Sequence, residues 1–157
     1  MITLALMVSL VTAWGAKASQ REVGDWLVTS MADRFSEVPT TNVVAIRVNE
    51  AGVFLAVRCL RGKLSLAMGG EKYESGDSFL VKFRVDDKPV IDTAARAISE
   101  DVMQISVQPG MVQQMIAGRE YALRISGETQ NDYLFHAGRS AAQALGAVTS
   151  ACLIDGK

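Results

Sequence analysis

The sequence predicts a mainly β protein, an antiparallel β-sandwich of about nine short strands with a short helix and a C-terminal helix. Apolar residues recur at every second position through most of the chain, and turn residues separate these runs at close spacing. Alternation with a period of two is typical of half-buried strands, and many short strands favour a sandwich or barrel. With 157 residues, 49% of them hydrophobic, the chain suffices for one domain with a sizeable core.

Each expected strand is a run in which every second residue is apolar, so that the apolar residues share one side of the strand. A typical run is 79–85, where Phe79, Val81, Phe83 and Val85 alternate with Leu80 and charged residues. Turn signals such as Arg61-Gly62-Lys63 lie between the runs. The nine runs are 25–31, 41–48, 53–59, 64–68, 79–85, 90–93, 103–107, 121–125 and 133–136.

Two segments break the strand pattern and predict helices. Residues 111–116 follow Pro109-Gly110 and end before Gly118, which fits a helix of one or two turns. In residues 140–152 the apolar stripe of Ala141, Leu145, Val148 and Cys152 has helical spacing, so we expect Cys152 on the buried face. Without linkers or internal repeats, residues 19–157 are expected to form a single domain.

The N-terminus has the pattern of a secretory signal peptide. Residues 1–16 are uncharged and mostly apolar, a run shorter than the roughly 20 residues of a membrane-spanning helix. Ala16-Lys17-Ala18 supplies a small-x-small cleavage pattern, which predicts a signal peptide over 1–18 and cleavage before Ser19. The alternative is a buried N-terminal helix or strand. Cleavage would leave 15 basic and 17 acidic side chains, a formal charge of −2, and no later membrane span is expected.

Cys59 and Cys152 are the two cysteines of the chain. In an exported protein, two cysteines are more often paired than free. Such a bridge would join the middle of the chain to its C-terminal helix, and the alternative is two separate buried thiols. The chain has no Cys-x-x-Cys motif, so the sequence gives little support to a redox-catalytic role.

Composition and motifs disfavour several function classes. A net charge of −1 argues against a general nucleic-acid-binding protein. No nucleophile elbow, phosphate-binding loop or metalloprotease motif occurs, and a catalytic triad would have to use His136, the single histidine, which lies in an expected strand. We therefore expect no enzyme activity, no metal and no cofactor.

A binding surface is the remaining candidate site. Arg47, Arg58, Lys82, Arg84 and Arg124 are all expected on strand faces opposite the apolar rows. If their strands are neighbours, these cations would form a stripe suited to carboxylates or an acidic partner. The alternative is an ordinary solvated face on which they pair with acids such as Asp86 and Glu50.

The order of several short motifs resembles a known family. These motifs are Gly24-Asp25-Trp26, Asp33, Val57-Arg58-Cys59, Lys82-Phe83-Arg84-Val85-Asp86, Phe135-His136-Ala137-Gly138 and Ala151-Cys152. Over about residues 24–153, the chain resembles the type VI secretion-associated VasI family, small exported proteins of Gram-negative bacteria. A second, weaker similarity, through the Gly-Asp-Trp strand start, is to the invasion-associated locus B family.

The first resemblance implies a non-enzymatic accessory protein of the periplasm with its two cysteines paired. Its partner would be another periplasmic or envelope protein, with no nucleic acid involved. The alternative function is a periplasmic inhibitor or immunity-type protein that neutralises a cell-wall- or membrane-targeting toxin.

Overall fold

A computed structural model describes residues 18–33 and 40–153, so the expected signal peptide lies almost entirely outside the described residues. The described residues form ten strands and two helices. In chain order these are β1 (Ser19–Val23), β2 (Trp26–Asp33), β3 (Thr40–Val48), β4 (Phe54–Leu60), β5 (Lys63–Gly69), β6 (Ser78–Val85), β7 (Ile91–Ala97), β8 (Val102–Ile105), α1 (Met111–Ala117), β9 (Glu120–Ser126), β10 (Gln130–His136) and α2 (Ala141–Leu153).

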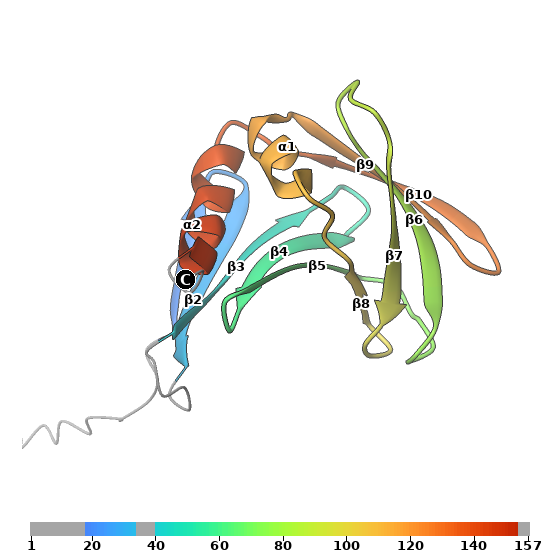
Figure 1. Cartoon of the computed structure of the whole chain (residues 1–157), viewed down its shortest axis with the longest axis horizontal. Coiled ribbons are helices and arrows are strands. Elements are labelled where there is room, and N and C mark those ends of the chain that lie inside the picture. Colours follow the sequence, from blue (N-terminus) through green and yellow to red (C-terminus); the bar gives the residue numbers. More distant parts are fainter. Residues whose placement is uncertain (1–17, 34–39, 154–157) are drawn as a thin grey trace, which may run out of the picture.

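The strands form one continuous antiparallel sheet in the order β1-β2-β3-β4-β5-β8-β7-β6-β9-β10. The prediction of a mainly β antiparallel fold with a short helix and a C-terminal helix is therefore confirmed. The sheet bends strongly, so that its two halves face each other across the core (Figure 1). Trp26 of β2 and Tyr121 of β9 lie near opposite ends of the strand order, yet their ring centroids are 6.5 Å apart.

Alternation along the strands places one face of the sheet toward the core. In β6, Val81, Phe83 and Val85 are buried while Lys82 and Arg84 are exposed. The strand registers continue this inner face through both halves of the sheet, and a single buried cluster joins them. The opposite, outer face is therefore available to carry the charged side chains.

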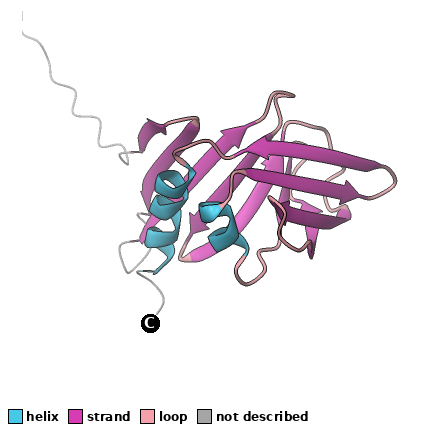
Figure 2. Cartoon of the chain, turned by 90° about the horizontal axis from the view of Figure 1, so that it is seen from above, coloured by secondary structure: helices cyan, strands magenta, loops and turns pink. Residues whose placement is uncertain are grey.

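Both helices cover the same end of the molecule, where they lie side by side (Figure 2). The longer helix, α2, packs against the first five strands of the sheet. Cys152 of α2 forms a disulfide with Cys59 of β4, with a Cα–Cα distance of 5.6 Å, which confirms the expected pairing. In the part of the chain that the structure describes, neither helix is long and apolar enough to span a membrane.

The strand β1 is missing from the sequence prediction, because it lacks apolar alternation. Four of its five residues are exposed, and only Val23 is buried. Its pairing with β2 through the two-residue turn Gly24-Asp25 needs the positive φ of 60° that Gly24 adopts. Because β1 begins at Ser19, the expected cleavage after Ala18 would leave this strand intact.

Candidate functional site

Three of the five predicted cations meet on the outer face of β6 and β9. The registers place Lys82 opposite Arg124, Asp92 opposite Lys82, and Asp132 opposite Arg124. Four charged side chains thus form a row across β7, β6, β9 and β10, with the two cations in its centre. We call these four residues the charged row.

Hydrogen bonds link each cation of the charged row to the acid beside it. Lys82 donates from Nζ to Asp92 Oδ1 over 2.7 Å. Arg124 donates from Nε and Nη2 to the two carboxylate oxygens of Asp132, each over 2.8 Å. This two-point contact lowers the pKa of Asp132, mainly through the hydrogen bond from Arg124. All four side chains remain open to solvent, so salt screens these pairs.

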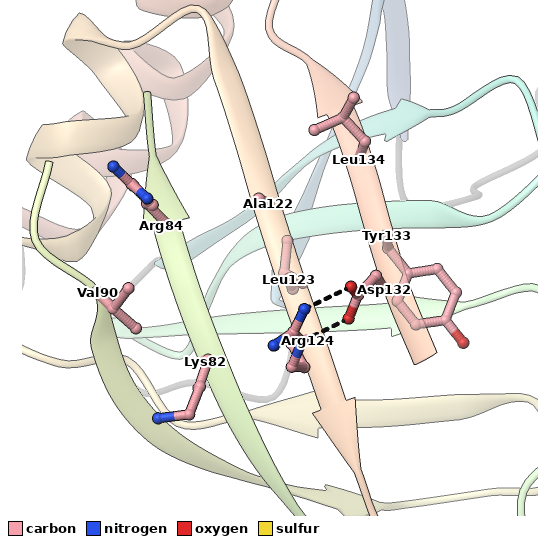
Figure 3. Close-up of a pocket in the computed structure, with 9 residues that line it drawn as sticks. All are labelled: Lys82, Arg84, Val90, Ala122, Leu123, Arg124, Asp132, Tyr133 and Leu134. Atoms are coloured by element: carbon pink, nitrogen blue, oxygen red, sulfur yellow. Dashed lines mark hydrogen bonds and ion pairs between the residues drawn. The ribbon is translucent and has the colours of Figure 1, made fainter. Parts of the chain in front are cut away.

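The next row of the outer face encloses a hollow. Arg84 lies opposite Ala122, and Ala122 lies opposite Leu134. Val90, just before β7, lies beyond Arg84 and completes the lining on that side. Because Ala122 has only a methyl group between longer neighbours, a hollow of about 420 Å³ opens over it, with Lys82, Arg124 and Asp132 of the charged row along one side (Figure 3). We call this depression the Ala122 hollow.

Of the cations that line the Ala122 hollow, Arg84 has the weakest contact with an acidic side chain. Its Nη2 lies 3.9 Å from Asp87 Oδ1, and the side chain of Asp87 is fully exposed. Among the described residues no hydrogen bond joins this pair, whereas Lys82 and Arg124 both donate to carboxylates. The guanidinium of Arg84 is therefore the group best placed to bind an anionic ligand.

Apolar side chains project into solvent around the same cations. Leu80 is 72% exposed, Val90 48% and Leu134 45%. Large apolar side chains interleaved with arginine are typical of protein-binding surfaces, while isolated exposed ones are ordinary. This combination makes the outer face of β6, β9 and β10 the strongest candidate surface among the described residues.

Arg58 does not belong to this surface. It lies on the outer face of β4, from which β5, β8 and β7 separate β6. Its guanidinium donates to Ser65 Oγ over 3.2 Å and to Gln104 Oε1 over 3.3 Å. Partial burial lowers the pKa of Arg58, and its contacts hold β4, β5 and β8 together rather than offering a free cation.

The expectation that Arg47 lies opposite the buried row of its strand is wrong. In β3 the structure buries Val43 and Ala45, on the same side as Arg47, and exposes 51% of Val48. Both sides of this strand are apolar, so alternation alone did not identify the buried one; α2 covers the side of Val43.

Arg47 instead makes a structural link. Its Nε donates to the carbonyl oxygen of His136 over 2.7 Å, and its Nη1 donates to the carbonyl oxygen of Asp25 over 3.0 Å. It therefore joins the turn before β2 to the end of β10, and its side chain is only 20% exposed.

The acids that pair with the cations differ from those that the sequence suggested. Asp86 accepts hydrogen bonds from the backbone N–H groups of Arg119 and Glu120, so it organises a turn. The observed partners are Asp92 for Lys82 and Asp132 for Arg124. In each hairpin, the acid follows the turn by as many residues as the cation precedes it. This symmetry about each turn is the signal that would have identified them.

His136 lies outside the Ala122 hollow. Its Nδ1 is 3.6 Å from Glu120 Oε2, and its side chain is 61% exposed. No serine or threonine hydroxyl is hydrogen-bonded to its ring in the part of the chain that the structure describes. Over residues 18–33 and 40–153, no group of three or more His, Cys, Asp or Glu side chains could hold a metal ion.

Comparison with known proteins gives a similarity of fold. No protein-family model and no curated protein matches the chain. Among solved structures, the chain is similar to the crystal structure of invasion associated protein B from Bartonella henselae, with a TM-score of 0.55 and 16% sequence identity. The similarity covers 84% of this chain and 96% of that one. At this identity the comparison shows a shared fold and nothing of function.

Proposed function

We propose that the chain is a non-enzymatic accessory protein of the Gram-negative periplasm that binds another envelope protein through the outer face of β6, β9 and β10. The observation that carries this proposal is the placement of Lys82 directly opposite Arg124. Like charges opposite each other destabilise a sheet, and departures from a local rule often mark functional surfaces. Exposed Leu80 and Leu134 beside these cations supply the apolar area that a protein partner would bury.

Two observations support export. The Cys59–Cys152 disulfide is a bond that forms and persists mainly in oxidising compartments such as the periplasm. The small-x-small pattern of Ala16-Lys17-Ala18 also lies directly before the first residue of β1. A connection with type VI secretion rests on the sequence resemblance alone.

Export is tested by the intact mass of protein recovered from a periplasmic fraction, alkylated with and without prior reduction. We expect loss of residues 1–18 and alkylation of two thiols only after reduction. A full-length chain with both thiols free would contradict the proposal.

Binding is tested by photo-crosslinking in cells. A benzophenone amino acid replaces Leu80, on the candidate face, or Gln143, an exposed residue of α2 that serves as the matched control. We expect one recurrent envelope protein, identified by mass spectrometry, from position 80 and not from position 143. The same adducts from both positions, or none from position 80, would contradict a specific surface. A cell-wall- or membrane-targeting toxin as the captured protein would favour the inhibitor or immunity function.

A further inference from the structure

We infer that the Ala122 hollow binds an extended acidic segment of the partner, with a carboxylate on Arg84 and an apolar side chain over Ala122 against Leu134. This inference rests on the proposed function and names the chemistry of its partner. Among the described residues, Lys82, Arg84 and Arg124 line the hollow with Asp132 as the single acidic side chain, so the lining favours a negatively charged ligand.

Existing contacts point to Arg84 as the anchor. Arg124 already uses Nε and Nη2 on Asp132, and Lys82 uses its ammonium on Asp92. Arg84 has a planar guanidinium that matches a carboxylate with two parallel hydrogen bonds, and Asp87 lies 3.9 Å from it. A ligand carboxylate can therefore bind Arg84 without breaking an existing hydrogen bond.

The spacing between Arg84, Ala122 and Leu134 on neighbouring strands indicates an extended peptide. Neighbouring strands are about 4.8 Å apart, so Arg84 and Leu134, two strands apart in this row, are separated by roughly 10 Å at the backbone. In an extended segment, side chains two residues apart point the same way at a separation of roughly 7 Å. An acidic residue held by the long Arg84 side chain would thus place the apolar residue two positions on over Ala122. The expected pattern is acidic-x-apolar.

The apolar walls distinguish this ligand from a simple anion. Val90 and Leu134 are each about half exposed and lie at opposite sides of the Ala122 hollow, where Ala122 leaves room between them. Inorganic phosphate or a free carboxylate would leave these side chains in water. A segment that carries both kinds of side chain uses the whole hollow.

The test measures fluorescence anisotropy of a labelled peptide of alternating Glu and Leu. Two further peptides alternate Glu with Ser and Lys with Leu. We expect the Glu-Leu peptide to bind, the Glu-Ser peptide to bind more weakly and the Lys-Leu peptide not to bind. Equal binding of the Glu-Leu and Glu-Ser peptides would overturn the apolar part of the inference, and no binding of the Glu-Leu peptide would overturn the inference as a whole.

Three variants locate the site. Arg84→Glu reverses the anchor, and Ala122→Phe fills the hollow without changing charge. Arg96→Glu is the matched control, because Arg96 lies on the outer face of β7 and does not line the hollow. We expect the Kd of the Glu-Leu peptide to rise about tenfold or more in the first two and less than about twofold in the control. An equal loss in Arg96→Glu would show bulk charge attraction and overturn the inference, as would unchanged binding in Ala122→Phe.

Thermal unfolding of each variant checks that it folds. Photo-crosslinking from position 80 in the Arg84→Glu variant distinguishes failure of the inference from failure of the proposed function. A crosslink that persists there at full yield would place the partner elsewhere on the face and overturn the inference while leaving the proposed function standing.

Discussion

Lys82 of β6 and Arg124 of β9 are paired residues of neighbouring strands, so two positive side chains stand next to each other on the outer face. Asp92 and Asp132 flank them, and each accepts a hydrogen bond from the nearer cation. An alternating order of charges would make every neighbouring pair opposite in sign and would place no two cations together. The arrangement instead concentrates positive charge beside the Ala122 hollow, which is where the proposed acidic segment binds.

Lys82→Thr separates the stability of the charged row from its role in binding. Threonine suits a strand, and the change removes both the repulsion from Arg124 and an exposed pair with Asp92. We expect the free energy of unfolding in urea to stay within about 0.5 kcal/mol of the parent, because exposed pairs contribute little. Affinity for the Glu-Leu peptide should fall. A loss of unfolding free energy well above about 1 kcal/mol with unchanged affinity would show that the charged row stabilises the fold and does not contribute to binding.

Trp26→Phe tests the contact that fixes the β1–β2 hairpin to the segment before α2. The indole Nε1 donates to the carbonyl oxygen of Ala137 over 2.6 Å, and Trp26 is almost fully buried. Removing the donor and part of the ring should lower the free energy of unfolding by about 2 to 4 kcal/mol. Met31→Leu, at an exposed position of the same strand, is the control and should change it by less than about 0.5 kcal/mol. A Trp26→Phe protein as stable as the parent would contradict this role.

Removing the disulfide should destabilise the fold without altering its topology. Cys59 and Cys152 are 93 residues apart in sequence, and closing so long a loop restricts the unfolded chain. The Cys59→Ala, Cys152→Ala double variant should lose about 2 to 5 kcal/mol of unfolding free energy in urea. Reductant should bring the parent protein to the same stability and leave the double variant unchanged. A parent protein whose stability is unchanged after alkylation has shown two reduced thiols would contradict this prediction.

The three tyrosines should make the protein sensitive to base. Burial, with the negative charge of Glu71, raises the pKa of Tyr73 to about 12. Burial is also the main cause that raises the pKa of Tyr121 and Tyr133, and Tyr133 donates a hydrogen bond to Glu71 as well. The unfolded state ionises near pH 10 while the folded state keeps its protons.

The stability that these protonated tyrosines contribute is therefore fully present below about pH 10, and it is lost as the pH rises through the raised values. Absorbance at 295 nm should show little tyrosinate near pH 10 in the native protein and a steep rise on unfolding in base. A smooth titration of all three tyrosines near pH 10 without unfolding would contradict their burial.

Most of the elements could be predicted because their alternation is strong. In β6 and β9 every second residue is apolar and the residues between are mostly charged or polar, so both the strands and their inner faces are predictable. The segment that became α2 has apolar residues at helical spacing, and Cys152 faces the sheet as expected. By contrast, β1 is an exposed edge strand whose polar residues carry no such pattern.

The candidate site was only partly predictable, because it depends on register between strands. Alternation places Lys82, Arg84 and Arg124 on an outer face, which the structure confirms. It does not indicate that Ala122 lies between Arg84 and Leu134, since three strands must be aligned to bring these residues together. Arg47 was misplaced for a related reason: β3 is apolar on both sides, and only the packing of α2 determines which side is buried.

The most direct test of the binding surface is a titration of isotope-labelled protein with the alternating Glu-Leu peptide, followed by backbone amide chemical shifts. The predicted result is a set of saturable shifts at Arg84, Ala122 and Leu134, with none at Arg58 and Gln104 on the outer face of β4 and β8. Saturable shifts centred on Arg58 and Gln104, or no saturable shifts around Ala122, would contradict it.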